Sequence, residues 1–465
     1  MTGKVIALLF AALTFASASG QQAGPWIVRP EWVKAHEDFL ASDMLRGRGS
    51  ATRDEGIAAT YVGARFESYG LKPAPGLQSF VQTVEVEKRE LDGHATLSAP
   101  GLAKPLQEGR DFYLVSASGE SASAPLKKIA DAKHGKAAPG SITLVSGGET
   151  AGPTVEESFS LAQQGAKVLL VPDSSGMKQI FQHDLGATTR TPMWLKGQAP
   201  RWTSLVVLTA AAESQVAGLG EGTQITFTVN KVADEPRFTY NAMGLLPGSG
   251  KGEGTLLITA HLDHLGVGNP VDGDSIYNGA DDDAAGTTAV LELAHALAAG
   301  PQPVRSVLFV CFGSEEQGDV GSSYFRDHPP VPLQDIIANI EFEMIGAQDP
   351  KMPKGKMMLT GWERSNLGPV LRQHGALLGP DRYPEQHFFQ RSDNYALALK
   401  GVVAQTVGGW PMPPYYHQPN DDLKHLDIAF MTNAIQSMVD PIRWLANTRF
   451  KPAWNPGGQP RAHVE

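Results

Sequence analysis

The stretch Thr255-Leu256-Leu257-Ile258-Thr259-Ala260, followed at once by His261-Leu262-Asp263-His264, sets both the fold and the chemistry predicted for this chain. Its first six residues are mostly apolar or β-branched, a composition typical of a buried strand. Three similar runs follow at residues 306–312, 336–343 and 402–407. Helical patterns alternate with these runs at residues 284–299, 364–374, 392–399 and 428–446. Buried strands that alternate with helices predict an α/β sheet.

The rest of the chain divides by composition. Residues 30–71 carry two amphipathic helical patterns, whereas residues 95–235 are rich in Gly, Ala and Ser and hold short β runs such as 142–145. The Gly-rich stretch 248–254 lacks the spacing of a phosphate loop and predicts a hairpin turn. We therefore predict a signal peptide at 1–20, the first part of the main domain at 26–95, an inserted β-rich domain at 96–235, the main α/β domain at 236–450 and a tail at 451–465, which is expected to be mobile after Ala453.

The first residues have the three-part pattern of a secretory signal. Lys4 precedes an apolar run at residues 5–13, and Ala16-Ser17-Ala18 offers a cleavage site between small residues. The run is too short to span a bilayer. We expect a periplasmic or secreted protein with no stable membrane association after cleavage.

Charge and cysteine content exclude two classes of function. The net charge is −10 over 465 residues, and no basic stretch is present to neutralise phosphates, so nucleic acid is not an expected partner. The single cysteine, Cys311, lies inside the apolar run 306–312. A buried apolar thiol is inert, so Cys311 is expected to be structural.

Polar residues with metal-ligand chemistry follow the predicted strands. His261 emerges from the first strand, and Asp263 lies two residues further on, where its carboxylate can accept from the second imidazole nitrogen and fix the ring. His264 is expected to support or pack against this site. Imidazoles combined with carboxylates suit zinc better than calcium or magnesium.

Three adjacent acids, Asp281, Asp282 and Asp283, precede the helical pattern at 284–299. Capping of that helix explains one of them, most naturally Asp283. It does not explain three, because adjacent anions repel unless a cation neutralises them. We predict that Asp281 bridges two metal ions.

The remaining acids and the second imidazole complete a two-metal set. Glu315 and Glu316 follow a buried strand and point in different directions, so that one can ligate metal while the other moves a proton. Glu343 ends the strand at 336–343, and His417 lies in a turn-rich loop after the strand at 402–407. Two metals about 3.5–4 Å apart can activate a water and polarise a carbonyl, so amide hydrolysis is the expected chemistry.

These residues resemble the co-catalytic dizinc aminopeptidase family, which includes bacterial leucyl aminopeptidases, aminopeptidase S, aminopeptidase Y, glutamate carboxypeptidase and glutaminyl cyclase. The match is carried by His261-x-Asp263-His264, Gly279-Ala280-Asp281-Asp282, Gly313-Ser314-Glu315-Glu316, Phe342-Glu343-Met344, Arg391-Ser392-Asp393 and Tyr416-His417. The resemblance implies a zinc exopeptidase (phosphorylase/hydrolase-like) fold: a mixed, mostly parallel central sheet flanked by helices. Residues 138–172 resemble a protease-associated domain, which is often inserted in this family.

The resemblance also assigns roles. It implies two zinc ions per chain, with Asp281 shared between them. The first ion would have His261 and Glu343, the second Glu316 and His417; Glu315 would be the general base, and Asp263 would orient His261. Two positions depart from the family, because many members have Asp where Glu343 stands and His where Asn394 stands. Glu341 is an alternative ligand to Glu343.

The expected substrates are peptides with a free N-terminus and an apolar or aromatic first residue. A negative rim would attract the α-ammonium group, and aromatic side chains near His417 would form a pocket. The residues expected at the substrate are Trp410, Tyr416, Phe389, Arg391 and Asp393. Arg391 is expected to pair with a neighbouring acid; a guanidinium facing the pocket would instead capture a carboxylate.

Three other functions remain open. A carboxypeptidase or dipeptidase of the same family would use the same metals. A glutaminyl cyclase-type acyl transferase dispenses with the His-x-Asp ligand, which is present here as His261 and Asp263. A binding module with an inactive peptidase core would have lost ligands, whereas every ligand position is filled.

Overall fold

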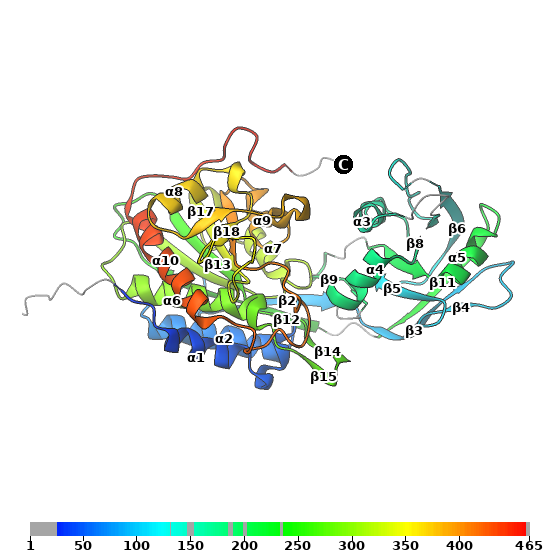
Figure 1. The fold of residues 1–465 in the computed structure, drawn as a ribbon, viewed down its shortest axis with the longest axis horizontal. Coiled ribbons are helices and arrows are strands. Elements are labelled where there is room, and N and C mark those ends of the chain that lie inside the picture. The colour runs from blue at the N-terminus through cyan, green and yellow to red at the C-terminus, as the bar shows by residue number, and fades with distance from the viewer. Residues whose placement is uncertain are drawn as a thin grey trace, which may run out of the picture.

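A computed structural model describes residues 26–130, 132–146, 153–184, 189–198, 202–232 and 236–461. The predicted signal peptide at 1–20 lies outside these residues. The described chain forms two large β-sheets that lie side by side along the long axis of the molecule, and a third sheet of two strands (Figure 1). No helix within the described ranges has both the length and the apolar character needed to cross a membrane.

The larger sheet has ten strands and carries the predicted strand ends. Its centre is four neighbouring parallel strands: β20 (Ala404–Gly408), β17 (Ile336–Glu343), β13 (Thr255–His261) and β16 (Ser306–Phe312). The flanking pairs include antiparallel ones, so the sheet is mixed and is parallel at its centre. The outer strands are β1 (Lys72–Pro73), β2 (Val81–Lys88), β9 (Met193–Leu195), β12 (Pro236–Leu246), β18 (Met357–Leu359) and β19 (Leu378–Pro380).

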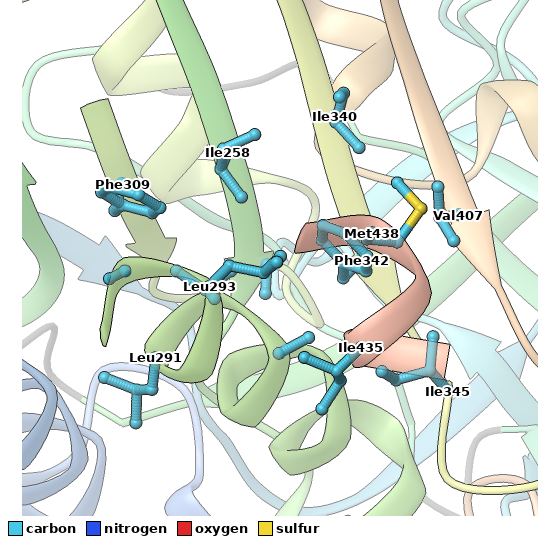
Figure 2. Packing of buried hydrophobic residues seen from close by; sticks show 14 of the residues in the cluster. Ile258, Leu291, Leu293, Phe309, Ile340, Phe342, Ile345, Val407, Ile435 and Met438 are labelled. Carbon is cyan, nitrogen blue, oxygen red and sulfur yellow. The ribbon is translucent and has the colours of Figure 1, made fainter. Parts of the chain in front are cut away.

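Helices cover both faces of this sheet, because alternate residues of each central strand point to opposite faces. Ile258 belongs to one buried cluster together with α6 (Gly286–Ala298) and α10 (Ile428–Asn447), as Figure 2 shows. Leu257, its neighbour, belongs to a second cluster on the other face. The remaining helices of this part are α1 (Pro30–Leu40), α2 (Arg53–Ser68), α7 (Val320–Asp327), α8 (Leu367–Gln373) and α9 (Asn394–Ala398).

The smaller sheet has eight strands, all drawn from residues 91–231. They are β3 (Leu91–Ser98), β4 (Leu106–Gln107), β5 (Phe112–Ser116), β6 (Ala122–Ile129), β7 (Ile142–Val145), β8 (Val168–Pro172), β10 (Ser204–Leu208) and β11 (Gln224–Lys231). Helices α3 (Val155–Ala162), α4 (Ser175–Gln179) and α5 (Ala210–Ala217) belong to the same part. The domain boundaries at 96 and 235, and the likeness to a protease-associated domain, stay predictions. Strand β9 lies in this stretch of sequence but pairs with β2 of the larger sheet.

Two local predictions are wrong. The Gly-rich stretch 248–254 is not a hairpin turn, because β16 lies between β12 and β13 and pairs with both. The described residues after Ala453 are bonded to the rest of the chain: Trp454 donates from Nε1 to the Gly401 carbonyl at 3.0 Å, and the Asn455 amide donates to the Arg364 carbonyl at 2.8 Å. A hairpin β14 (Gly266–Val271) and β15 (Asp274–Tyr277) stands apart from both sheets.

Candidate metal centre

The carboxyl ends of the central parallel strands bring the predicted ligands to one edge of the sheet. His261 is the last residue of β13, and Glu343 is the last residue of β17. Glu315 and Glu316 follow the end of β16, and His417 lies in the loop that follows β20. Ligand sites in open α/β sheets form at such edges, so strand order alone predicts the meeting point.

Asp282 lies between the two predicted imidazole ligands. Its Oδ1 is 3.2 Å from His261 Nε2, and its Oδ2 is 3.1 Å from His417 Nε2. His417 Nε2 is also 3.3 Å from Glu316 Oε2. Asp282 therefore contacts the ligands expected for both metal positions, which is what a shared carboxylate must do.

Asp281 does not occupy this place, although the sequence predicted it as the bridge. Its Oδ1 accepts from the Gly346 amide at 2.6 Å, and its Oδ2 accepts from the Tyr415 hydroxyl at 3.2 Å. Burial, and then the neighbouring Asp421, hold the pKa of Asp281 well above its usual range. Burial would raise the pKa of Asp282 too, but the contacts with His261 and His417 override it and hold that pKa well below its usual range. The distances therefore place Asp282, and not Asp281, between the two imidazoles.

Asp283 bonds to the first residue of α6, although the N-cap residue of that helix is Ala285 and not Asp283. Its Oδ1 accepts from the Gly286 amide at 2.8 Å, at the first turn of α6, and from the Met344 amide at 3.0 Å. Each of the three adjacent acids thus contacts a different set of groups.

Several of the buried nitrogen and oxygen atoms at this site lack hydrogen-bond partners, as expected if they bind a divalent metal. His261 Nε2 and Glu316 Oε1 are buried and have no hydrogen-bond partner among the described residues, although other site atoms lie close by. Such orphaned polar atoms are costly in a folded protein. Burial also raises the pKa of Glu343 to about 7. Cations among these groups would satisfy the orphaned atoms and stabilise the carboxylates, so the residues fit zinc.

Glu315 faces the cleft beside these ligands. The side chain is half-buried, and burial raises its pKa well above the usual range. Its backbone amide donates to Asp263 Oδ1 at 3.0 Å, while Asp263 Oδ2 accepts from Ser50 Oγ at 2.6 Å. Asp263 therefore fixes the chain at Glu315.

The carboxylate of Asp263 does not hold the ring of His261 as closely as predicted. His261 Nδ1 lies 3.8 Å from Asp263 Oδ1, beyond hydrogen-bonding distance, and 3.3 Å from the Asp263 carbonyl oxygen. The main chain of Asp263 is thus the closer partner of the ring, because both carboxylate oxygens already accept other donors.

The two acids of β17 take separate places. Glu341 is fully buried, and its Oε2 accepts from the Asn394 amide at 2.6 Å, whereas Glu343 borders a small hollow near the site. This makes Glu343 the better placed ligand of the two. Asn394, the second departure from the family, donates from Nδ2 to the Phe389 and Ala404 carbonyls, so its amide supports the backbone.

Sequence reasoning missed two residues that hold the acid loop. Arg48 is fully buried and donates to four carbonyls, including those of Leu262 and Gly279 on either side of the site. Asp421 accepts from the amides of Asp281 at 2.8 Å and Asp282 at 3.0 Å. Asp421 lies four residues after the predicted ligand His417, so the sequence could have indicated it. Arg48 lies more than 200 residues before the first ligand, and nothing in the sequence connects it to the site.

A cleft of about 810 Å³ opens in front of the centre. Glu315, Glu316, His417, Tyr416 and Arg391 line it from the larger sheet. Lys88, at the end of β2, and Arg89 also line it, together with Glu90, His94, Glu108 and Arg190. Beside it lies a hollow of about 40 Å³, lined by Glu343, Met344, Met358, Phe388, Arg391, Pro411 and Tyr416, among others.

The predicted substrate residues do not all reach these cavities. Tyr416 and Arg391 line both. Phe389 is buried in the core beside Leu397 and Trp454, and its neighbour Phe388 lines the hollow instead. Asp393 is fully buried behind the site, and Trp410 lines neither cavity.

Arg391 has no ion pair among the described residues, contrary to the prediction. Its guanidinium lies over the ring of Phe388, 5.1 Å from the centroid, with the side chain exposed in the cleft. A cation–π contact leaves its N–H donors available to a ligand.

Residues 241–440 match the model of peptidase family M28. Over 142 residues the chain is 30% identical to leupeptin-inactivating enzyme 1 of Streptomyces exfoliatus, covering 30% of each chain. It is 26% identical to aminopeptidase YwaD of Bacillus subtilis (strain 168) over 175 residues, or 36% of each. These matches span about a third of either relative. A zinc aminopeptidase structure from Bacillus subtilis superposes with a TM-score of 0.58 at 17% identity, covering 94% of this chain and 99% of that one, and thus shares the fold.

Proposed function

We propose that this chain is an exported dizinc aminopeptidase that removes apolar N-terminal residues from peptides. The observation that carries the proposal is the place of Asp282 between His261 and His417, with Glu316 beside His417. The proposed ligands are His261, Asp282 and Glu343 for one ion and Asp282, Glu316 and His417 for the other. The match of residues 241–440 to peptidase family M28 and the aminopeptidases among the relatives support the same reaction.

Two zinc ions held there would supply Lewis acids that activate water and polarise the scissile carbonyl. Glu315 is then the residue that moves the proton. It is half-buried in the cleft wall and raised in pKa by burial, which suits a group that takes a proton from water and passes it to the leaving amine. Asp263 holds Glu315 in place through the backbone amide.

The small hollow suits the side chain of the first residue. Met344, Met358, Phe388 and Pro411 give it apolar walls, and Glu343 stands at its border. Its volume of about 40 Å³ favours an aliphatic side chain over a large aromatic one. The carboxylates of the centre lie beside it, where they attract an α-ammonium group.

A carboxypeptidase or dipeptidase of the same family is the second candidate, and Arg391 is the observation that favours it. A guanidinium free to donate two parallel hydrogen bonds is a natural partner for a terminal carboxylate. Arg391 borders both the hollow and the cleft.

Two substrate panels separate the candidates. The aminopeptidase should release p-nitroaniline from Leu- and Met-p-nitroanilide, with Phe-p-nitroanilide slower, and should leave N-acetylated peptides intact. Cleavage of acetylated peptides with free C-termini, without release from the anilides, would assign a carboxypeptidase. Activity on unblocked dipeptides alone would assign a dipeptidase. Hydrolysis in none of these panels by zinc-loaded protein would refute the peptidase proposal.

A further inference from the structure

A third imidazole, that of His264, points at the position flanked by Asp282, Glu316 and His417. These four residues each offer one donor atom, and all four atoms lie within 4.8 Å of one another. His264 Nδ1 is 2.8 Å from Glu316 Oε1 and 3.9 Å from Asp282 Oδ2. In a tetrahedral zinc site with bonds of about 2.0–2.1 Å, donors stand about 3.4 Å apart. The two distances from His264 Nδ1 lie on either side of this value, so His264 is within reach of an ion that Glu316 and Asp282 also hold.

The ring of His264 has no other use for its nitrogens among the described residues. The side chain is fully buried, and neither Nδ1 nor Nε2 has a hydrogen-bond partner there. The approach of Nδ1 to Glu316 lacks the geometry of a hydrogen bond, and Glu316 Oε1 is itself unsatisfied. The two atoms can form an ion pair only if the imidazole is protonated, whereas a cation between them would satisfy both with the imidazole neutral.

The backbone makes room for this ring. Gly279 has a φ of +60°, and a Cβ on it would lie 2.5 Å from Cγ of His264. It would also lie 2.2 Å from the Asp282 carbonyl oxygen, so any side chain at Gly279 would displace the acid loop, the imidazole or both. The glycine next to the acid loop thus serves the placement of His264 as well as the left-handed turn.

We propose that His264 is a metal ligand that binds through Nδ1 and joins Asp282, Glu316 and His417 around one ion. This inference rests on the proposed dizinc function. It makes the two metal positions unequal, because one has two imidazoles and the other has His261 alone. The position with two neutral imidazoles and two carboxylates is expected to bind zinc more tightly.

Zinc X-ray absorption on the native protein tests the inference without any substitution. With both positions loaded, three imidazoles shared by two ions give an average of about 1.5 per zinc. If only His261 and His417 ligate, the average is about 1. An average of about 1 in protein that holds two zinc ions would overturn the role of His264 and leave the peptidase proposal standing. Protein that binds no zinc would overturn the peptidase proposal itself.

Two substitutions separate a ligand from a residue that merely positions Glu316. The amide of His264→Asn can still donate to Glu316 from near the place of Nδ1, but an amide is a poor zinc ligand, and His264→Ala removes both possibilities. We expect both variants to lose one zinc equivalent to a competing chelator, with more than about 100-fold weaker binding, above the 10–100-fold typical of supporting residues. Native-like zinc retention in His264→Asn would identify a positioning residue and refute ligation.

The matched control is His36→Asn, which changes another buried imidazole on α1, where His36 Nδ1 contacts the Tyr61 hydroxyl at 2.8 Å. It should keep both zinc ions and the native absorption spectrum. Cobalt-loaded protein gives an independent reading, since the visible spectrum of the His264 variants should change only for one of the two equivalents.

Discussion

The eight-stranded sheet buries no charged side chain in its described part, residues 91–231, whereas the ten-stranded sheet buries histidines, carboxylates and guanidinium groups beside its apolar core. Burying an unpaired charge is expensive, so a fold carries such groups only where they are paired or bind a cation. The smaller sheet can be stable by apolar packing alone. The larger sheet buries polar groups that cost stability but can bind a metal, so the chemistry is expected at the larger sheet.

The largest effect is expected when the proposed proton acceptor of the larger sheet, Glu315, is replaced. Glu315→Gln keeps the shape of the side chain and removes its proton-accepting oxygen, so kcat should fall by about 10²–10⁴-fold. Zinc content, measured by elemental analysis, should stay at the native level because no ligand changes. The control is Glu363→Gln, because Glu363 has an exposed side chain in the 3₁₀ turn Trp362–Arg364, away from the proposed ligands. Near-native turnover in Glu315→Gln would place the base elsewhere.

The second test compares two neighbouring acids. Asp282→Asn removes the carboxylate between the two imidazoles, so zinc affinity should fall more than about 100-fold at both positions and activity should fall with it. Asp281→Asn changes a side chain that binds Gly346 and Tyr415, so its loss should stay within about 10–100-fold. Equilibrium dialysis against a zinc buffer measures both. The reverse order would restore Asp281 as the bridge.

Much of this site could be predicted from the sequence, for a physical reason. Buried parallel strands end at one edge, so His261 and Glu343 were found from the strands that carry them. The three acids lie in an irregular turn, η3 (Ala280–Ala285), where no periodicity tells which side chain faces inward. The same holds for Phe388 and Phe389, which occupy a single 3₁₀ turn.

Features that depend on contacts between distant segments of the chain were harder to predict from the sequence. The glycines at 248–254 have the local signature of a hairpin, but the pairing of β16 with both β12 and β13 decides their path. Composition also suggested a loose tail, whereas the hydrogen bond of Trp454 to Gly401 fastens it. His264 shows the same limit, because its partners come from three other segments of the chain.

The third test addresses the apolar sheet. Leu170 is fully buried in the core of the smaller sheet, so Leu170→Ala should cost about 2–5 kcal/mol of that part's stability. Zinc content should not change. Removing zinc with a chelator should instead destabilise the larger sheet. If the free zinc concentration was 100 times the Kd of a site, the loss is about 2.7 kcal/mol of unfolding free energy for that site. Differential scanning calorimetry separates the two. A single transition shifted equally by both changes would mean that the sheets unfold as one unit.

The smallest expected effect lies where the two parts meet, at Arg190. Its guanidinium is exposed in the cleft wall opposite Glu315, and its Nη2 donates to the Glu316 carbonyl at 3.3 Å. If a peptide whose first residue sits at the centre extends its carboxyl end toward Arg190, the exposed ion pair formed there contributes about 0.2–1 kcal/mol. Arg190→Ala should therefore raise KM for tripeptides by up to about 5-fold, leave kcat unchanged, and leave KM for p-nitroanilides, which lack the carboxylate, unchanged. Arg110→Ala removes an exposed guanidinium of the smaller sheet that pairs with Asp111 and does not line the cleft, and it should change neither constant. A KM increase that is equal for tripeptides and anilides would show that Arg190 shapes the centre through Glu316, and the smaller sheet would then act on catalysis and not on the choice of substrate.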